Sequence, residues 1–278
     1  MREGRLNLLK SLMAVLDLND RDETSYALAR YFLEHFDTLA DLNIYDVMDE
    51  CYASRSGVRR FCQSIGFDNF SEIKACASEW DLFRHYYLTY PRSEQEGQHD
   101  LRRDLSLLYQ SIDRLVAAGA FDTLVDTLHA CDQAVLFSAG PSAVQLSEFQ
   151  SAMVTQHKLV QLVTESSPAS GVIRALGPND VLIAVSTSGA FVERQVAQIR
   201  DSGAYKVYVT ANDREDLASL FDEVILIGEG VTDDAAVHRV FATYGICYTF
   251  DRLFSAYSGK YDHEPLPQEG RKTCSASG

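Results

Sequence analysis

The chain has 278 residues, of which 46% are hydrophobic and 23% are charged, and its formal net charge is −15. The length exceeds the roughly 100–200 residues of one domain and the composition is that of a globular protein, so we expect two domains, each with its own core. The negative charge argues against a protein that coats nucleic acid by bulk electrostatics. Residues 1–85 carry 10 Lys+Arg against 15 Asp+Glu, so any contact with DNA must be local.

Other composition signals narrow the class further. The first ten residues lack an apolar segment followed by a small-residue cleavage site, so we expect no secretory signal. The longest nearly apolar stretch, Val240–Phe250, is about half of the ~20 residues that a membrane-spanning helix needs. Six widely spaced cysteines without a CxxC pair disfavour zinc sites and a disulfide framework. We therefore expect a cytoplasmic protein with reduced, mostly structural thiols, no metal site and no cofactor.

The N-terminal third shows helical patterns only. Hydrophobic residues recur at helical spacing from Leu6 to Leu16, and again after Asp22 from Tyr26 to Phe36. A short third helix, Ile44–Glu50, is expected to be capped by the side chain of Asn43.

A fourth helix is expected from Ser54, its N-cap, to Gln63, with Gly66 closing it. Its apolar residues fall within about a 100° arc of the helix. They are Val58, Phe61, Cys62 and Ile65. A short helix, a tight turn and a second helix with one buried stripe outline a helix-turn-helix.

The pattern changes after the next expected helix, which runs from Ser71 to about Tyr90 and stops at Pro91. The polar segment Pro91–His99 is typical of an interdomain linker and leads to a helix at Leu101–Ala117. Five apolar runs then indicate buried strands: Ala134–Phe137, Leu159–Val163, Val181–Val185, Val207–Thr210 and Val224–Ile227. The gaps leave room for one crossover helix each, which predicts a doubly wound parallel five-stranded α/β sheet.

The remaining chain is expected to form a strongly apolar helix from about Ala235 to Tyr257, buried against the sheet and a second subunit, and then a polar tail. The expected domain boundaries are 1–90 for an all-α helix-turn-helix domain that binds DNA, 91–119 for a linker and connecting helix, 120–262 for the α/β domain and 263–278 for the flexible tail.

The first candidate site is the polar side of the helix that begins at Ser54. Its residues are Ser54, Arg55, Ser56, Arg59, Arg60 and Gln63. Arginine can contact phosphates or read guanine with two hydrogen bonds, while serine and glutamine supply adaptable contacts. The alternative is an ordinary solvated helix face.

The run from Asn43 to Lys74, NIYDVMDECYASRSGVRRFCQSIGFDNFSEIK, resembles the helix-turn-helix of the RpiR family. The matching residues are Arg60, Phe61, Ile65, Gly66, Phe67, Phe70, Ser71, Glu72, Ile73 and Lys74. Two positions depart from that pattern. Tyr52 occupies a turn position usually held by glycine, at a cost of roughly 1–2 kcal/mol if φ is positive there. Gly57 replaces a common threonine, at a cost of about 1 kcal/mol relative to alanine in a helix.

The second candidate site comprises two turns that follow predicted parallel strands and open helices. The first contains Ser138, Gly140 and Ser142, and the second Ser186, Thr187, Ser188 and Gly189. Their hydroxyls and backbone N–H groups should converge at the carboxyl edge of the sheet, beside positive helix ends that suit a phosphate. The alternative is that serine and glycine are simply good turn and cap residues.

The segment from about Ala134 to Tyr257 resembles the sugar isomerase (SIS) domain, a phosphosugar-binding module that accompanies the RpiR-type DNA-binding domain. The resemblance implies that the turns bind a phosphorylated sugar. Two positions depart from it: Ser138 replaces a glycine, and Phe191 replaces a threonine, so that a phosphate would lose one hydroxyl and meet a bulky ring.

The sequence and the two resemblances together indicate a regulator of carbohydrate-metabolism genes rather than an enzyme. Its expected partners are a double-stranded DNA operator, a phosphorylated sugar effector and further copies of the chain in a homodimer or homotetramer. Two alternatives stay open: a sugar-phosphate isomerase or lyase, and an SIS interaction module that has lost its ligand. His157 and His238 are candidate proton shuttles, and Glu148 and Glu165 are candidate bases, although structural or solvated roles are more common for such residues.

Overall fold

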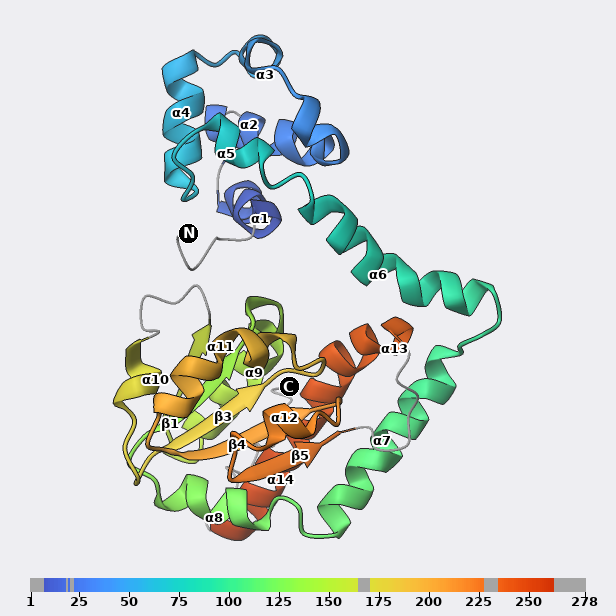
Figure 1. The fold of residues 1–278 in the computed structure, drawn as a ribbon, viewed down its shortest axis with the longest axis vertical. Helices are drawn as coiled ribbons and strands as arrows, with labels where there is room; N and C mark the ends of the chain where they lie inside the picture. Colours follow the sequence, from blue (N-terminus) through green and yellow to red (C-terminus); the bar gives the residue numbers. More distant parts are fainter. Residues whose placement is uncertain (1–7, 19, 21–22, 165–170, 228–234, 263–278) are drawn as a thin grey trace, which may run out of the picture.

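The computed structural model describes residues 8–18, 20, 23–164, 171–227 and 235–262. Helices alone form the N-terminal part, and an α/β part with a five-stranded sheet follows it, as Figure 1 shows. This order confirms the predicted fold class. No helix in the described ranges is long and apolar enough to cross a membrane.

The helical part is built around one hydrophobic core. Its elements are α1 (Leu8–Leu18), α2 (Thr24–Glu34), the 3-10 helix η1 (Phe36–Asp41), α3 (Ile44–Glu50), α4 (Arg55–Ser64) and α5 (Phe70–Lys74). The second predicted helix ends two residues early, because the backbone leaves the helical region at His35 and Phe36 begins η1. Asp22 lies outside the described residues.

The helix predicted from Ser71 to Tyr90 is two helices. The Oδ1 of Asn69 accepts hydrogen bonds from the backbone N–H groups of Ser71 and Glu72, and it thereby starts α5 at Phe70. Bonds between residues three apart then tighten the chain into a turn before α6 (Glu79–Gln95). Neither feature interrupts the hydrophobic pattern, and for this reason the sequence suggested one helix.

Proline 91 does not end α6, contrary to the expectation. A proline inside a helix removes one hydrogen bond and costs roughly 3 kcal/mol. Its neighbours Tyr90 and Ser93 are buried, and Tyr90 belongs to the core of the α/β part. We attribute the continuation of α6 through Pro91 to this burial, which offsets the cost of the missing bond.

The sheet order is β2-β1-β3-β4-β5, and all pairs are parallel, which confirms the predicted doubly wound sheet. The strands are β1 (Ala134–Ser138), β2 (Val160–Thr164), β3 (Val181–Val185), β4 (Tyr205–Thr210) and β5 (Glu223–Leu226). The intervening helices are α9 (Gly140–Val154), α10 (Val172–Ala175), α11 (Ala190–Asp201) and α12 (Glu215–Ala218). Because the strands are parallel, their carboxyl ends share one edge.

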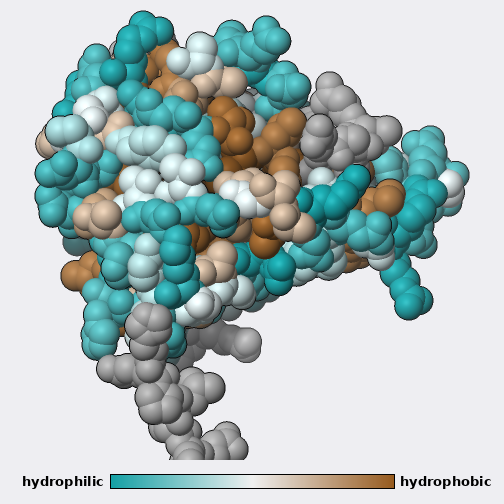
Figure 2. Space-filling view, turned by 90° about the horizontal axis from the view of Figure 1, so that it is seen from below, coloured by the Kyte–Doolittle hydropathy of each residue, from teal (hydrophilic) through white to brown (hydrophobic). Residues whose placement is uncertain are grey.

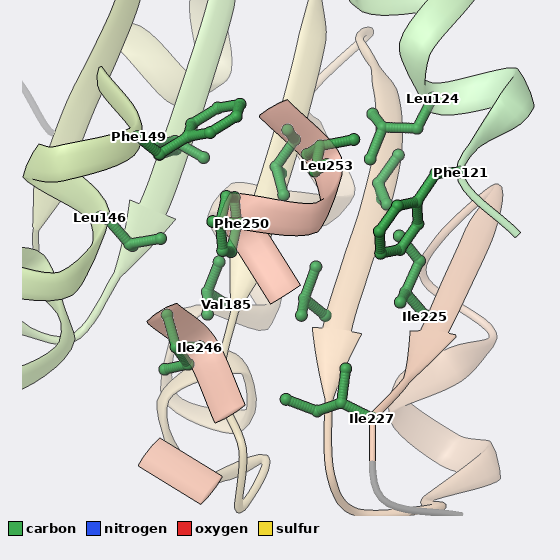
Figure 3. Packing of buried hydrophobic residues seen from close by; sticks show 14 of the residues in the cluster. Phe121, Leu124, Leu146, Phe149, Val185, Ile225, Ile227, Ile246, Phe250 and Leu253 are labelled. Carbon is green, nitrogen blue, oxygen red and sulfur yellow. The ribbon is translucent and has the colours of Figure 1, made fainter. Parts of the chain in front are cut away.

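Each face of the sheet has its own hydrophobic core. One face packs against α10, α11 and α12, and the other against α9, α7 (Leu101–Ala117), α8 (Asp122–Ala130) and the C-terminal helices. Figure 3 shows Phe149 of α9 beside Phe250 of the last helix, with the two ring centroids 5.0 Å apart. In Figure 2, which views the molecule from below Figure 1, mostly hydrophilic residues surround smaller hydrophobic patches.

The predicted C-terminal helix is present but is not uniform. It comprises α13 (Ala235–Val240), a π-helical turn η3 (Phe241–Gly245) and α14 (Ile246–Tyr261). Its burial against the sheet is confirmed by Phe250 and Leu253, each 2% exposed. The polar tail lies outside the described residues.

Candidate functional sites

The first candidate site is the outer face of α4. Ser54 is the N-cap, and its Oγ accepts a hydrogen bond from the backbone N–H of Gly57 at 3.1 Å. Val58, Phe61 and Cys62 are buried on the inner face. All six predicted residues are exposed: Ser54, Arg55, Ser56, Arg59, Arg60 and Gln63. The helical period thus separates the core-facing stripe from an arginine-bearing surface.

The helices around this face form the predicted helix-turn-helix outline. After α3, the chain turns at Tyr52, whose φ is +48°, and the backbone N–H of Ala53 bonds to the carbonyl of Met48 at 2.9 Å. The ring of Phe61 stacks on Phe32 of α2 at 5.9 Å and holds α4 to the core. Gly66, at φ +90°, closes the helix as predicted.

The surface of α4 continues into an open cleft formed with α5. Arg55, Ser56 and Arg59 line one wall, and Asn69 and Ser71 line the other. Within the described ranges, no carboxylate forms an ion pair with the three arginines of α4. Their positive charge is therefore available to an anionic partner.

The second candidate site lies where β1 and β3 end. Ser138 and Val185, the last residues of these strands, are register partners in the sheet. The chain leaves β1 for β2 on one side and leaves β3 for β4 on the other. The strand order therefore reverses between β1 and β3, and ligands of open α/β sheets bind at such a switch point. The predicted convergence of the two turns follows from this topology.

Side chains of β4 and of the residues after it hold the turn that follows β3. The hydroxyl of Tyr208 donates to the carbonyl of Ser186 at 3.3 Å, and Thr210 Oγ1 donates to that of Thr187 at 3.4 Å. Asn212 Nδ2 donates to the carbonyl of Ser188 at 3.3 Å. The carbonyl oxygens thus face β4. The sequence analysis did not single out Tyr208, Thr210 and Asn212, although polar side chains at the end of the next strand are a signal by which such residues can be found.

Backbone donors of the same turn are available. Among the described residues, the N–H groups of Thr187 and Ser188 have no hydrogen-bond acceptor. Gly189 has φ +79°, and a Cβ there would lie 3.0 Å from Leu217 Cδ1, so only glycine fits without a shift. Ser186 is buried, and its Oγ accepts from the N–H of Phe191 at 3.3 Å. Backbone N–H groups that lack an acceptor at the start of a helix such as α11 suit an anion.

The turn after β1 offers fewer accessible polar groups than the turn after β3. Ser138 is fully buried, and its Oγ donates to the carbonyl of Ala139 at 2.9 Å. The backbone N–H of Ser142 bonds to the same carbonyl at 3.0 Å, and Gly140 is the first residue of α9. Ser142 is half-buried, so of the two hydroxyls in this turn it is the more accessible one.

Phe191 does not stand in the path of a ligand, contrary to the expectation. Its side chain is 3% exposed, and its ring lies edge-on to Phe137 at 4.8 Å in the core below α11. The reason is helical geometry, because α11 turns Phe191 and Val192 toward the sheet. The substitution for threonine therefore removes a hydroxyl without filling the turn.

The two candidate acid–base residues whose side chains the structure describes do not lie together at this edge. Glu148 is exposed on α9, about 12 Å along the helix from Gly140. His157 is exposed and precedes β2, so it lies at the opposite, amino edge of the sheet. Glu165 and the side chain of His238 lie outside the described residues.

Five of the six cysteines are described, and all five are free. Four are buried, as expected of structural thiols, whereas Cys247 is exposed. Burial raises the pKa of the Cys51 and Cys62 thiols to about 11, so both are protonated at neutral pH.

No family model matches the chain. The chain is 21% identical over 173 residues to the HTH-type transcriptional regulator GlvR of Bacillus subtilis (strain 168), a match that covers 62% of this chain and 63% of GlvR. It therefore spans less than two thirds of that relative.

Two solved structures are similar in fold. One is the Vibrio vulnificus NanR protein complexed with ManNAc-6P, with 16% identity, a TM-score of 0.46 and 92% of each chain covered. The other is the sugar isomerase domain of an RpiR transcription factor from Sphaerobacter thermophilus, with 15% identity, a TM-score of 0.45, and 57% of this chain and 89% of that chain covered.

The match to GlvR and the motif at Asn43–Lys74 are similarities in sequence, and neither of them depends on the two structures. The order of the two parts is the one expected from the sequence, since a helical region with the helix-turn-helix outline precedes a five-stranded parallel sheet. On these grounds, the chain is similar in sequence to an HTH-type transcriptional regulator, and its helix-turn-helix motif resembles that of the RpiR family.

Proposed function

We propose that the chain is a DNA-binding transcriptional regulator of carbohydrate-metabolism genes whose SIS domain dimerises and senses a phosphorylated sugar. The observation that carries the proposal is the exposed face of α4, on which three arginines lack a carboxylate partner in the described part of an otherwise acidic chain. Direct contacts to base edges and phosphates need such a face. The name of GlvR, an HTH-type transcriptional regulator, supports the same reading.

Dimerisation has a physical motive. One acidic domain with a single arginine-bearing helix would hold DNA weakly, because affinity depends strongly on the number of neutralised phosphates. Two linked helix-turn-helix domains reach two half-sites, and the second contact then forms at a raised effective concentration. A homodimer or homotetramer built on the SIS domain would supply this linkage.

The DNA-binding proposal is tested by replacing Arg59 and Arg60 with alanine. Each good arginine–base contact is worth roughly 1–3 kcal/mol, so the double variant should bind about thirtyfold more weakly or worse. The measurement is fluorescence anisotropy with duplexes that the purified wild-type protein selects from a random-sequence library. The control is Arg102→Ala/Arg200→Ala, two exposed arginines of α7 and α11 that give the same change in net charge. A folded double variant with unchanged DNA affinity rejects the proposal for this face.

The effector proposal assigns a phosphate group to the turns that contain Ser138, Gly140, Ser142 and Ser186, Thr187, Ser188, Gly189. A ligand that binds only the folded state at 100 times its Kd stabilises it by about 2.7 kcal/mol, which a thermal-shift assay against phosphorylated sugars detects. Ser188→Ala should reduce the shift, whereas Ser151→Ala, an exposed serine of α9, should leave it unchanged. If no phosphorylated sugar shifts the protein, the SIS domain acts as an interaction module instead.

An enzyme with the same fold would isomerise or cleave a sugar phosphate and would need a positioned base. Assays for interconversion of ketose and aldose phosphates address this alternative directly. Turnover that Glu148→Gln or Glu165→Gln abolishes would overturn the regulator-only account.

A further inference from the structure

Tyr52 combines two unfavourable features. Its φ of +48° is in the left-handed region, where a tyrosine Cβ is crowded, and its side chain is 96% exposed. Within the described part of the chain, the ring and hydroxyl have no hydrogen bond, ring contact or ion pair. Nothing in the free protein therefore stabilises a tyrosine here, where glycine or asparagine would be less strained. Strain of this kind concentrates at functional sites.

The position of Tyr52 indicates what the side chain meets. It lies two residues before Ser54, the N-cap of α4, and so at the leading end of the face that carries Arg55 and Arg59. A recognition helix in the major groove points its N-terminal residues at the bases. The turn before that helix then lies at the edge of the groove, along which the sugar–phosphate backbone runs. Tyrosine hydroxyls are among the donors that bind backbone phosphates.

We propose that the hydroxyl of Tyr52 donates a hydrogen bond to a backbone phosphate of the bound duplex. The proposal rests on the proposed function, DNA binding by α4. A hydrogen bond to a charged oxygen is stronger than one between neutral groups, so the complex recovers what the strained turn costs the free protein. Since phosphates carry no base identity, the contact strengthens binding to all sequences alike.

The test measures stability and DNA affinity together. Tyr52→Gly should leave the melting temperature unchanged or higher, and Tyr52→Phe should leave it unchanged. Both should weaken binding to the selected duplex about tenfold, the equivalent of about 1.4 kcal/mol. The matched control is His157→Gly, which relieves a φ of +55° at an exposed position in the α/β part and should leave DNA affinity unchanged.

A methylphosphonate scan of the duplex locates the contact. At one phosphate, the neutral substitution should weaken the wild type but not Tyr52→Phe, so that the two proteins bind that duplex equally. If Tyr52→Phe binds every duplex as the wild type does, the phosphate contact is wrong even though the protein binds DNA. If the wild type selects no duplex at all, this inference fails together with the DNA-binding proposal, and the selection experiment itself identifies that case.

Discussion

Ser54 has two roles that can be separated. In the free protein its Oγ satisfies the backbone N–H of Gly57, and Ser56 Oγ lies 3.0 Å from the same oxygen. Helix α4 depends on this cap more than most helices do, because its first turn has no acidic residue and contains a glycine. At the same time Ser54 is exposed at the end of the proposed DNA-binding face.

Ser54→Ala should therefore lower the free energy of unfolding by about 1 kcal/mol, the usual cost of losing a serine cap. Ser54→Asp should keep the stability, since aspartate caps equally well and favours the positive helix end. The aspartate variant should nevertheless bind DNA more weakly than the wild type, because it brings a negative charge to the phosphates. Urea unfolding and anisotropy measure the two effects. Equal losses of stability in both variants would contradict a capping role.

Local chemistry determines some features of single residues, and tertiary packing determines others. The cap at Ser54, the exposed arginines and the positive φ at Tyr52 were predictable, because each follows from local helix and turn chemistry. The direction of the Phe191 side chain was not predictable, since its position after the turn could be assigned to the ligand edge or to the core. Only the packing against Phe137 decides it.

Among the elements, the strands were predicted within about two residues. β1 and β3 are apolar runs that are buried throughout, and each of the other three strands has an apolar run that is buried in part, so composition and burial largely coincide. The helices were predicted less well where a turn or a bulge keeps the hydrophobic pattern intact. The division between α5 and α6 and the π-helical turn η3 are of this kind, because capping by Asn69 and tertiary packing override periodicity there.

A hydrogen bond between β4 and β5 leads us to expect that the free energy of unfolding depends on pH. The hydroxyl of Tyr205 donates to Glu223 Oε2 at 3.1 Å. Burial and the nearby carboxylate raise the pKa of Tyr205 to about 12, above the value of about 10 for an unfolded tyrosine. The folded state then holds this proton more tightly than the unfolded state. Its contribution to stability is complete below about pH 10 and is lost as the pH rises from about 10 to about 12.

Tyr205→Phe should therefore make the free energy of unfolding fall less steeply above about pH 10 than in the wild type. Urea unfolding at a series of pH values measures the slope, and Tyr45→Phe, an exposed tyrosine of α3, is the control. The same slope in Tyr205→Phe as in the wild type would show that this proton is not linked to folding.

The expected linker at Pro91–His99 forms a corner between α6 and α7, visible at the right of Figure 1. The hydroxyl of Tyr90 in α6 donates to Asp104 Oδ2 of α7 at 2.8 Å, and His99 Nδ1 lies 2.9 Å from the same oxygen. The side chains of Asp104 and His99 are only 9% and 10% exposed. Burial and the bond to Asp104 raise the pKa of Tyr90, which keeps the phenol protonated as the donor. Composition indicated a linker but could not reveal this network, because its partners lie on different elements.

We expect this corner to fix the direction in which α6 leaves the α/β part. Asp104→Ala removes the acceptor of the buried Tyr90 hydroxyl and one partner of His99, and should cost about 2–4 kcal/mol of unfolding free energy. Spin labels on cysteines introduced at the exposed positions Gln63 of α4 and Ser151 of α9, in a Cys247→Ser/Cys274→Ser background, report the distance between the two parts. The wild type should give a narrow distance distribution and Asp104→Ala a broad one, while Asp132→Ala, at an exposed aspartate, should match the wild type.

A second contact lies nearby, where the Arg239 guanidinium is 5.7 Å from the centre of the Tyr87 ring and joins α13 to α6. If Asp104→Ala lowers stability but keeps the narrow distribution, the α6–α13 contact rather than the corner sets the orientation, and Tyr87→Ala should then broaden it.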